Sequence, residues 1–363
     1  MSALHAKIRD MILQDGPIPL ELYMMLALSH PSLGYYASRD PLGEKGDFIT
    51  SPEISQMFGE LLGLWAVDAW TNMGSPGELH LIELGPGRGT LMQDALRAAK
   101  LAPDFLAALQ VHLVEASPIL IEAQKQRLSG YAHQIHWHAS LDTIPEGPSI
   151  VLANEFFDAL PVRQYVKTPN GWHERMIGLD ENDSLAFGLS PDAETNIKAE
   201  APIGSVLEIS TLSYRLIMQI AQRLLRSGGA ALIIDYGHVQ TSFGETLQAI
   251  SGHQPVDPLA NPGEADLSAH VDFDSLQRAA RNSGAQIYGP VLQADFLKRL
   301  GIEQRAASLM HQADETQSAA IAAALKRLTQ IDQPTDMGAL FKVMAFTHPA
   351  MPEPAGFESG IRF

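Results

Sequence analysis

The chain has 363 residues, of which 42 are acidic and 25 are basic, so its formal net charge is −17. This charge argues against a surface that neutralises nucleic-acid phosphates, and it is compatible with a cationic partner. The absence of cysteine excludes disulfides, thiolate zinc sites and a cysteine nucleophile. The 13 histidines have no metal-ligand spacing, so we expect no metal. No apolar run is long enough to span a membrane and the N-terminus lacks a signal-peptide core, so we predict a cytoplasmic protein with no membrane span.

The N-terminal part of the chain predicts helices followed by a loop. Residues 1–30 have two short helical patterns that break at Gly16-Pro17, and residues 29–45 are rich in turn residues. Thr50 and Glu53 then have the spacing of a capping box, ahead of a helical pattern with one apolar face. Two roles stay open for Thr50 and Ser51, since they could cap this helix or contact a ligand as the end of a loop that closes over it.

The centre of the chain has the pattern strand, glycine turn, helix. Leu79–Leu84 is a short apolar run, which predicts a buried strand, and the turn that follows contains Gly85, Gly87 and Gly89. Glycines let the backbone N–H groups of such a turn approach a ligand closely, and the next helix points its positive end at the same place. This segment therefore predicts a nucleotide-binding cradle.

The spacing of the glycines separates two kinds of cofactor. A dinucleotide turn reads G-x-G-x-x-G, with an acid about 20 residues further on. Here the turn reads G-x-G-x-G, and the acid, Glu83, comes just before it. This spelling resembles the first motif of class I S-adenosylmethionine (SAM) methyltransferases, so a dehydrogenase is disfavoured.

Strands and helices alternate through the rest of the chain, which predicts a parallel sheet covered on both faces. We expect further strands at residues 111–114, 135–139, 149–153, 230–234, 286–291 and 340–346. Two segments lie outside this core: residues 163–209 predict a small β insertion, and residues 296–328 predict a helical insertion. We divide the chain into an N-terminal helical region (1–74), a core with these insertions (75–347) and a loose C-terminal tail (348–363).

Six blocks of the sequence resemble the MidA-like family of SAM-dependent methyltransferases, namely residues 46–53, 83–90, 114–118, 154–161, 232–237 and 263–273. The blocks follow the family order over nearly the whole chain, and those around Asn154 and Asp266 are not general methyltransferase motifs. One departure is Ser268, which stands where the family pattern has threonine. The family includes a mitochondrial assembly factor of respiratory complex I that methylates an arginine of a complex I subunit.

The resemblance implies a class I fold, SAM as the methyl donor, and symmetric dimethylation of a protein arginine. The partner would then be an arginine-bearing protein, with a subunit of complex I as one candidate, and not a nucleic acid. The missing mitochondrial leader fits a bacterial member. The insertions could bind a partner or form a homodimer, and the sequence does not decide between these.

An arginine methyltransferase needs acidic groups that orient the planar guanidinium and take up the proton lost after methyl transfer. Glu155 and Asp158, just after the fourth core strand, are our candidates for these catalytic acids, with Phe156 and Phe157 as walls of the pocket. Asp158 could instead cap a helix, and the two phenylalanines could belong to the core. Asp235 follows the fifth strand at the same edge and is a candidate for substrate contact.

The cofactor-binding candidates come from the carboxyl ends of the strands. We expect the glycine turn and Glu83 near the amino-acid end of SAM, and Glu115, which ends the second strand, at the ribose. The complete set of candidates is Thr50, Ser51, Glu83, Gly85, Gly87, Gly89, Glu115, Leu141, Asp142 (the last two at the adenine) and Asn154. Two other functions share this core: a methyltransferase for a small molecule, and an assembly factor that binds SAM without catalysis.

Overall fold

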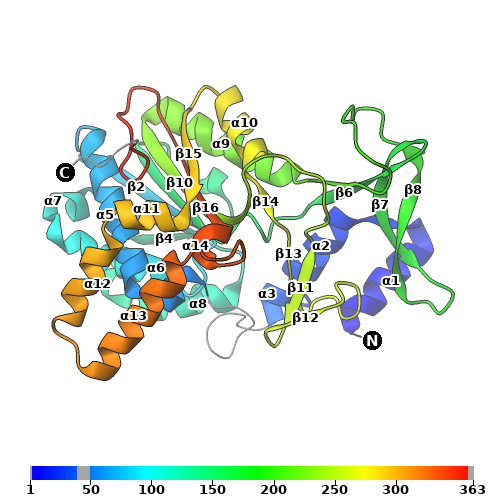
Figure 1. The fold of residues 1–363 in the computed structure, drawn as a ribbon, viewed down its shortest axis with the longest axis horizontal. Helices are drawn as coiled ribbons and strands as arrows, with labels where there is room; N and C mark the ends of the chain where they lie inside the picture. Colours follow the sequence, from blue (N-terminus) through cyan, green and yellow to red (C-terminus); the bar gives the residue numbers. More distant parts are fainter. Residues whose placement is uncertain (1, 39–49, 359–363) are drawn as a thin grey trace. The chain divides into compact units, whose positions relative to one another are not determined.

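The computed structural model describes residues 2–38 and 50–358 (Figure 1). Contacts divide the chain into two compact units, each built from three segments. Unit 1 consists of Met1–Phe48, Asp158–Arg215 and Gln240–His270, and unit 2 of Ile49–Phe157, Leu216–Val239 and Val271–Phe363. The predicted boundary at residue 74 thus lies inside unit 2, and the predicted domain division stays a prediction.

Unit 2 contains the sheet that the strand pattern predicts. In chain order its main strands are β2 (Leu79–Leu84), β3 (Leu109–Val114), β4 (Ile135–His138), β5 (Ser149–Asn154), β10 (Gly229–His238), β15 (Gln286–Leu292) and β16 (Phe341–Thr347). Their order across the sheet is β15-β16-β10-β5-β2-β3-β4, and the short strand β14 (Val271–Asp272) also pairs with β10. Pairing is parallel from β10 to β4, whereas β16 runs antiparallel to both β10 and β15. The predicted α/β class and its seven strands are confirmed, and β16 departs from the predicted parallel pairing.

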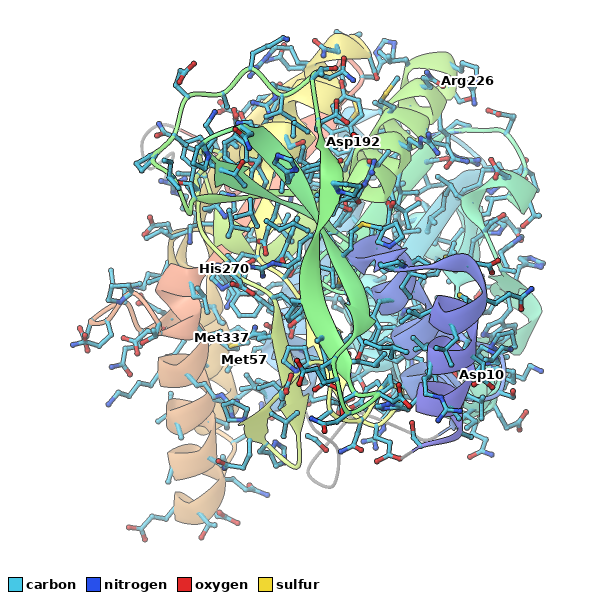
Figure 2. The ribbon with its side chains drawn as sticks, turned by 90° about the vertical axis from the view of Figure 1, so that its right-hand side faces the viewer. Asp10, Met57, Asp192, Arg226, His270 and Met337 are labelled. Atoms are coloured by element: carbon cyan, nitrogen blue, oxygen red, sulfur yellow. The ribbon has the colours of Figure 1, made fainter. Side chains whose placement is uncertain are left out.

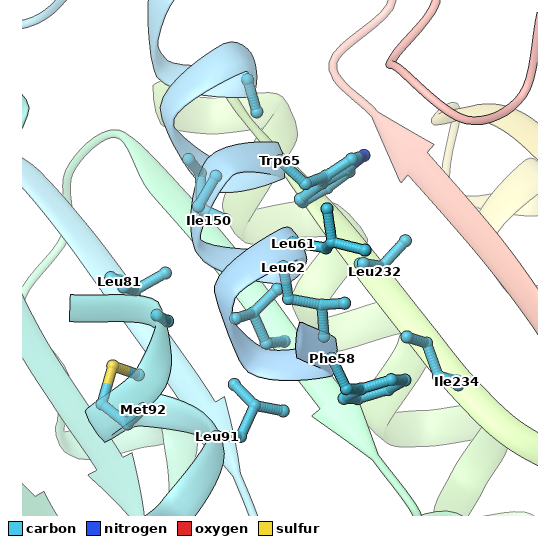
Figure 3. Packing of buried hydrophobic residues seen from close by; sticks show 14 of the residues in the cluster. Phe58, Leu61, Leu62, Trp65, Leu81, Leu91, Met92, Ile150, Leu232 and Ile234 are labelled. Atoms are coloured by element: carbon cyan, nitrogen blue, oxygen red, sulfur yellow. The ribbon is translucent and has the colours of Figure 1, made fainter. Parts of the chain in front are cut away.

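Helices bury the faces of this sheet, which explains why its central strands are almost continuously apolar. Phe58, Leu61, Leu62 and Trp65 of α5 (Gln56–Asn72) pack on Leu81, Ile150, Leu232 and Ile234 of the neighbouring strands β2, β5 and β10 (Figure 3). Trp65 is 1% exposed. The other helices of the alternating pattern are α6 (Thr90–Ala98), α7 (Pro103–Ala108), α8 (Pro118–Arg127), α9 (Thr211–Ser227) and α10 (Phe273–Asn282).

The capping box predicted from Thr50 and Glu53 is wrong. Thr50 precedes a short separate helix, α4 (Ser51–Ile54), and makes no side-chain capping bond. The carboxylate of Glu53 instead accepts a hydrogen bond from the Thr90 hydroxyl. The cap of α5 is Ser55, whose hydroxyl accepts the N–H of Met57 at 3.2 Å.

The predicted helical insertion, residues 296–328, lies in a run of four helices, α11 (Gln293–Arg299), α12 (Ile302–Met310), α13 (Glu315–Thr329) and α14 (Met337–Leu340). Glu60 of α5 fastens it to the core, because its carboxylate accepts from Arg97 of α6 at 2.9 Å and from Arg305 of α12 at 2.7 Å. Its pKa is lowered: burial acts to raise it, but the bonds and charges of the two arginines outweigh burial.

The predicted loose tail is wrong for the residues described, up to 358. Phe357 is buried and its ring lies 5.4 Å from that of Phe296, and Trp65 donates its indole N–H to the Ala355 carbonyl at 3.1 Å. The sequence did not predict this packing, because the tail has no periodic pattern of apolar residues.

Unit 1 combines N-terminal helices with the β insertion. The strands β1 (Ile18–Pro19), β6 (Arg163–Thr168), β7 (Gly171–Leu179), β8 (Leu185–Ala193) and β9 (Val206–Ile209) form one sheet, and β11 (Gln248–Ser251), β12 (Gln254–Val256) and β13 (Asp266–Ser268) form another. Figure 2 shows the β7–β8 hairpin, with Asp192 exposed on β8. The predicted helices are α1 (Ala3–Asp15) and α2 (Leu20–Ser29), and they break at Gly16-Pro17 as expected. The predicted 29–45 loop contains a helical turn, α3 (Tyr35–Ser38), and its last residues lie outside those described.

The histidines of the core form a ladder across β2, β3 and β4. His80 Nδ1 lies 2.9 Å from His112 Nε2, and His112 Nδ1 lies 2.9 Å from His138 Nε2. Burial, and then the neighbouring His80, lower the pKa of His112 to about 3. No three His, Cys, Asp or Glu side chains within residues 2–38 and 50–358 form a group that could hold a metal ion. No helix in the same residues is both long and apolar enough to cross a membrane.

Candidate functional site

The glycine turn follows β2 at the carboxyl edge of the unit 2 sheet. Gly85, Gly87 and Gly89 have φ values of 61°, 54° and 79°. This left-handed conformation is unfavourable for residues other than glycine. Gly85 donates its N–H to the Val114 carbonyl at 3.1 Å, and Gly89 is the N-cap residue of α6. The turn therefore brings backbone to the positive end of a helix, where an anionic or carboxylate group binds favourably.

The turn after β5 packs directly against this glycine turn. A Cβ built on Gly85 would lie 2.7 Å from Cδ2 of Phe156, so the phenylalanine ring occupies the space of a side chain at position 85. The ring of Phe156 also lies edge-on to that of Phe157, with centroids 5.4 Å apart. The residues that the sequence predicted for cofactor and for substrate are thus brought together at one edge of unit 2.

Glu155 stands on this turn in a strained backbone conformation. Its φ is +50°, which is uncommon for a residue other than glycine and marks functional sites more often than others. Its Oε1 accepts the backbone N–H of Ser51 at 2.7 Å and the amide Nδ2 of Asn154 at 3.0 Å. Its own N–H donates to the Ile234 carbonyl at 2.9 Å, which fixes the turn to β10. The carboxylate is therefore held in a defined orientation.

Asp235, which follows the apolar part of β10, holds the same turn by hydrogen bonds. Its side chain is fully buried, and Oδ2 accepts the N–H groups of Phe156 at 3.1 Å and Phe157 at 2.9 Å. Oδ1 accepts the N–H of Tyr236 at 2.9 Å. The sequence suggested substrate contact here, whereas the geometry gives Asp235 a positioning role. The signal for it was an acid that directly continues a buried apolar strand.

Glu115, at the end of β3, is oriented in a similar way. Its Oε1 accepts the N–H groups of Ala116 and Ser117, both at 2.8 Å, and its Oε2 lies 3.3 Å from Nε2 of Gln124. Gln124 also donates to the Gly87 carbonyl at 2.7 Å, so it connects this carboxylate to the glycine turn. Sequence reasoning missed Gln124, which looks like an ordinary helical residue of α8. Burial raises the pKa of Glu115.

Glu83 lies within β2 and is 3% exposed. Burial, and then the charge of Glu115, raise its pKa to about 8, so it is largely protonated at neutral pH. Among the described residues its Oε2 has no hydrogen-bond partner, and neither do Asn154 Oδ1 and Ser51 Oγ. Buried polar atoms without partners are costly, and a polar ligand that hydrogen-bonds to them would remove that cost.

The remaining predicted residues make fewer contacts with the turns at the carboxyl edge of the unit 2 sheet. Leu141 is buried at the start of a 3-10 turn after β4, and Asp142 beside it is exposed and accepts a hydrogen bond from Gln219 of α9. Thr50 has an extended backbone, and the rest of its predicted loop, residues 46–49, lies outside the described residues. Asp158 belongs to unit 1, where its backbone carbonyl accepts the N–H of Ala269 at 3.0 Å.

Comparison with known proteins shows which family the chain is similar to. A family model described as "Putative S-adenosyl-L-methionine-dependent methyltransferase" matches residues 61–291. The chain is 43% identical over 331 residues to protein arginine methyltransferase NDUFAF7, mitochondrial, of Mus musculus, a match that covers 84% of this chain and 75% of the relative. It is 40% identical over 378 residues to the Drosophila melanogaster homolog, covering 94% and 84%.

A solved structure is similar over almost the whole chain. It is a protein from Burkholderia thailandensis, described as a "likely methyl transferase" and bound to S-adenosyl-homocysteine (SAH), with a TM-score of 0.85 and 28% identity. The match covers 99% of this chain and 95% of that one. The fold of this chain is therefore that of SAM-dependent methyltransferases, as the sequence predicted.

Proposed function

Because the chain belongs to this family of S-adenosyl-L-methionine-dependent methyltransferases, we propose that it transfers methyl groups to arginine side chains of a protein substrate. The arginine specificity is taken from the named relatives and from the family resemblance of the sequence. We further propose, as that resemblance implies, symmetric dimethylation, with a subunit of respiratory complex I as a candidate substrate, and a bacterial cytoplasmic location.

The residues at the carboxyl edge of unit 2 fit the cofactor of the family, SAM. The glycine turn offers backbone N–H groups at a helix N-terminus, which suit a carboxylate. Glu83 and Asn154 have buried oxygens that no group in residues 2–38 or 50–358 hydrogen-bonds, and these suit the ammonium and hydroxyl donors of an amino acid and a ribose. The carboxylate of Glu115 is oriented by the N–H groups of Ala116 and Ser117, and we propose that it binds the ribose, with Thr50, Ser51, Leu141 and Asp142 as further contacts of the cofactor. When bound, SAM supplies a methyl group on a sulfonium.

The observation that carries the proposal is the carboxylate of Glu155, held by Ser51 and Asn154 on a strained turn whose next residue packs on the glycine turn. A guanidinium stays protonated in water, and its planar fork pairs well with a carboxylate. Glu155 would align one nitrogen for in-line attack and accept the proton that the nitrogen loses. Asp158, three residues on in the sequence, is our second acid.

The test is Glu155→Gln in the full chain. The glutamine oxygen can still accept the bonds from Ser51 and Asn154, so SAH affinity should change less than about threefold, while arginine methylation should fall by about 100-fold or more, within the range of a lost acid–base group. Affinity is measured by calorimetry, and methylation by transfer of labelled methyl from SAM to protein substrates that include isolated complex I subunits. Glu122→Gln, which changes an exposed glutamate on α8, is the matched control. Full methylation by Glu155→Gln would refute the assignment of Glu155.

A non-catalytic assembly factor and a small-molecule methyltransferase are the competing functions. SAH binding without methylation of any arginine-bearing partner would favour the first. Methylation of a metabolite in preference to proteins would favour the second.

A further inference from the structure

Four polar residues from three distant segments of unit 1 lie close together. Tyr36 is in α3, Asp158 begins the second segment of the unit, and Asp266 and Ser268 are in β13. The Tyr36 hydroxyl donates to Oδ1 of Asp266 at 3.0 Å. The backbone carbonyl of Asp158 accepts the N–H of Ala269 at 3.0 Å, so the chain at Asp158 runs beside the end of β13.

The charges of both carboxyl groups act on the same hydroxyl. The pKa of Tyr36 is raised well above its usual value, first by burial and then by the negative charges of Asp266 and Asp158. Tyr36, Asp158 and Asp266 are each partly exposed. Two acids near one another at a position that solvent reaches create a region of negative potential, which favours a cation.

Ser268 is a second, independent indication of a ligand. It is 2% exposed, and its Oγ has no hydrogen-bond partner among the described residues. Residues two apart in a strand project to the same face, so Ser268 and Asp266 share one face of β13. A buried hydroxyl is normally hydrogen-bonded. The Ser268 oxygen, next to an acid, can therefore accept a hydrogen bond from a donor group of a ligand.

We propose that Tyr36, Asp158, Asp266 and Ser268 form a subsite in unit 1 that binds the guanidinium group of an arginine in the protein substrate. This inference rests on the proposed function and deepens it, since it adds three residues that would select the substrate. A guanidinium carries five N–H donors in a planar fork and no acceptor, and the subsite offers two carboxylates and a hydroxyl oxygen. Tyr36 has the role of a positioning residue, because its bond fixes the orientation of the Asp266 carboxylate.

The test uses the full chain saturated with SAH and two small probes. N-acetyl-arginine amide carries the guanidinium, and N-acetyl-citrulline amide has nearly the same shape without the charge. We expect the arginine probe to bind at least tenfold more tightly than the citrulline probe in NMR titrations. Asp266→Asn should lower the ratio of the two affinities by about tenfold, in line with a lost hydrogen bond to a charged group. Ser268→Ala should weaken only the arginine probe, by a smaller factor.

Asp192→Asn is the matched control, because it removes an exposed acid of the same unit on β8 (Figure 2). It should leave both probes unaffected. Melting temperature and SAH affinity are measured for each variant, and Ser268→Ala decides the question if Asp266→Asn does not fold. Equal affinity for the two probes, no binding of the arginine probe by the folded protein, or unchanged selectivity in the folded variants would overturn the subsite. A folded wild-type protein that does not bind SAH would overturn the proposed function instead, and arginine-probe binding would still decide the subsite.

Discussion

The ring of Phe156 takes the place of a side chain on Gly85: a Cβ there would lie 2.7 Å from Cδ2 of the ring. Gly85 also has a φ of 61°, which a residue with a Cβ adopts only at a cost. The glycine turn and the turn that carries Glu155 are thus fitted to one another at this contact. Four consequences of such contacts can be measured.

Gly85→Ala should destabilise the protein by about 1–3 kcal/mol, from the strained φ together with the contact with Phe156. SAH affinity should fall as well, because the turn must move. Urea unfolding and calorimetry measure the two effects. In a Phe156→Ala background the substitution should cost less, since the clash is gone and only the φ strain remains. Gly77→Ala is the control, as no atom of the part of the chain that the structure describes lies within 4 Å of its added Cβ. Equal costs at positions 77 and 85 would contradict this explanation.

Asp235→Asn should destabilise unit 2 by about 1–3 kcal/mol and should also weaken SAH binding. The asparagine has one acceptor oxygen, whereas the two oxygens of Asp235 accept three backbone N–H groups, from Phe156, Phe157 and Tyr236. At least one buried donor is therefore left without a partner, and the turn that holds Glu155 loses its support. Urea unfolding measures the loss, with the exposed Asp332→Asn as the control. A variant as stable as the wild type would show that the turn needs no such support.

The sequence predicted the sheet well because each core strand is a local signal, an apolar run bounded by turn residues. The sequence also indicated where Glu115 and Glu155 lie, because the residues that follow parallel strands meet at one edge of the sheet, whereas Glu83 lies within β2. The glycine turn could also be predicted, because the spacing of its three glycines is a local signal within a few consecutive residues.

What the sequence did not predict depends on contacts between distant segments. Unit 1 joins three segments that carry the strands β1, β6–β9 and β11–β13, and no local pattern shows that Tyr36 approaches Asp266. The capping box failed because Thr90, far along the chain, bonds to Glu53 instead. Gln124 was missed because a glutamine on a helix is usually at the surface, and here it is fully buried.

Glu115→Ala should lower SAH affinity by about 10-fold to 100-fold, the range expected when a charged hydrogen-bond acceptor is lost. Glu115→Gln should lie between this variant and the wild type, because its carbonyl oxygen can still accept the N–H groups of Ala116 and Ser117. Calorimetry with SAH measures the affinities. Glu122→Ala, an exposed position on α8, is the control, and unchanged affinity in Glu115→Ala would refute the ribose assignment.

Glu83 should make the stability of the protein depend on pH in a direction opposite to that of most acids. Burial, and then the charge of Glu115, raise its pKa from the usual 4.5 to about 8 in the folded state. Between these values the folded protein holds a proton that the unfolded chain has lost, so the free energy of unfolding falls as pH rises from 4.5 to 8. Glu83→Gln resembles the protonated acid and removes this dependence.

The stability advantage of Glu83→Gln over the wild type should therefore grow with pH up to about 8, by at most about 1.4 kcal/mol per pH unit. Above that pH it should stay constant. Urea unfolding of both proteins at several pH values measures this difference. Glu122→Gln, at an exposed position, should show no such trend and controls for the loss of an acid. A difference between Glu83→Gln and wild type that is flat between pH 5 and 8 would show that Glu83 is already ionised in the folded protein.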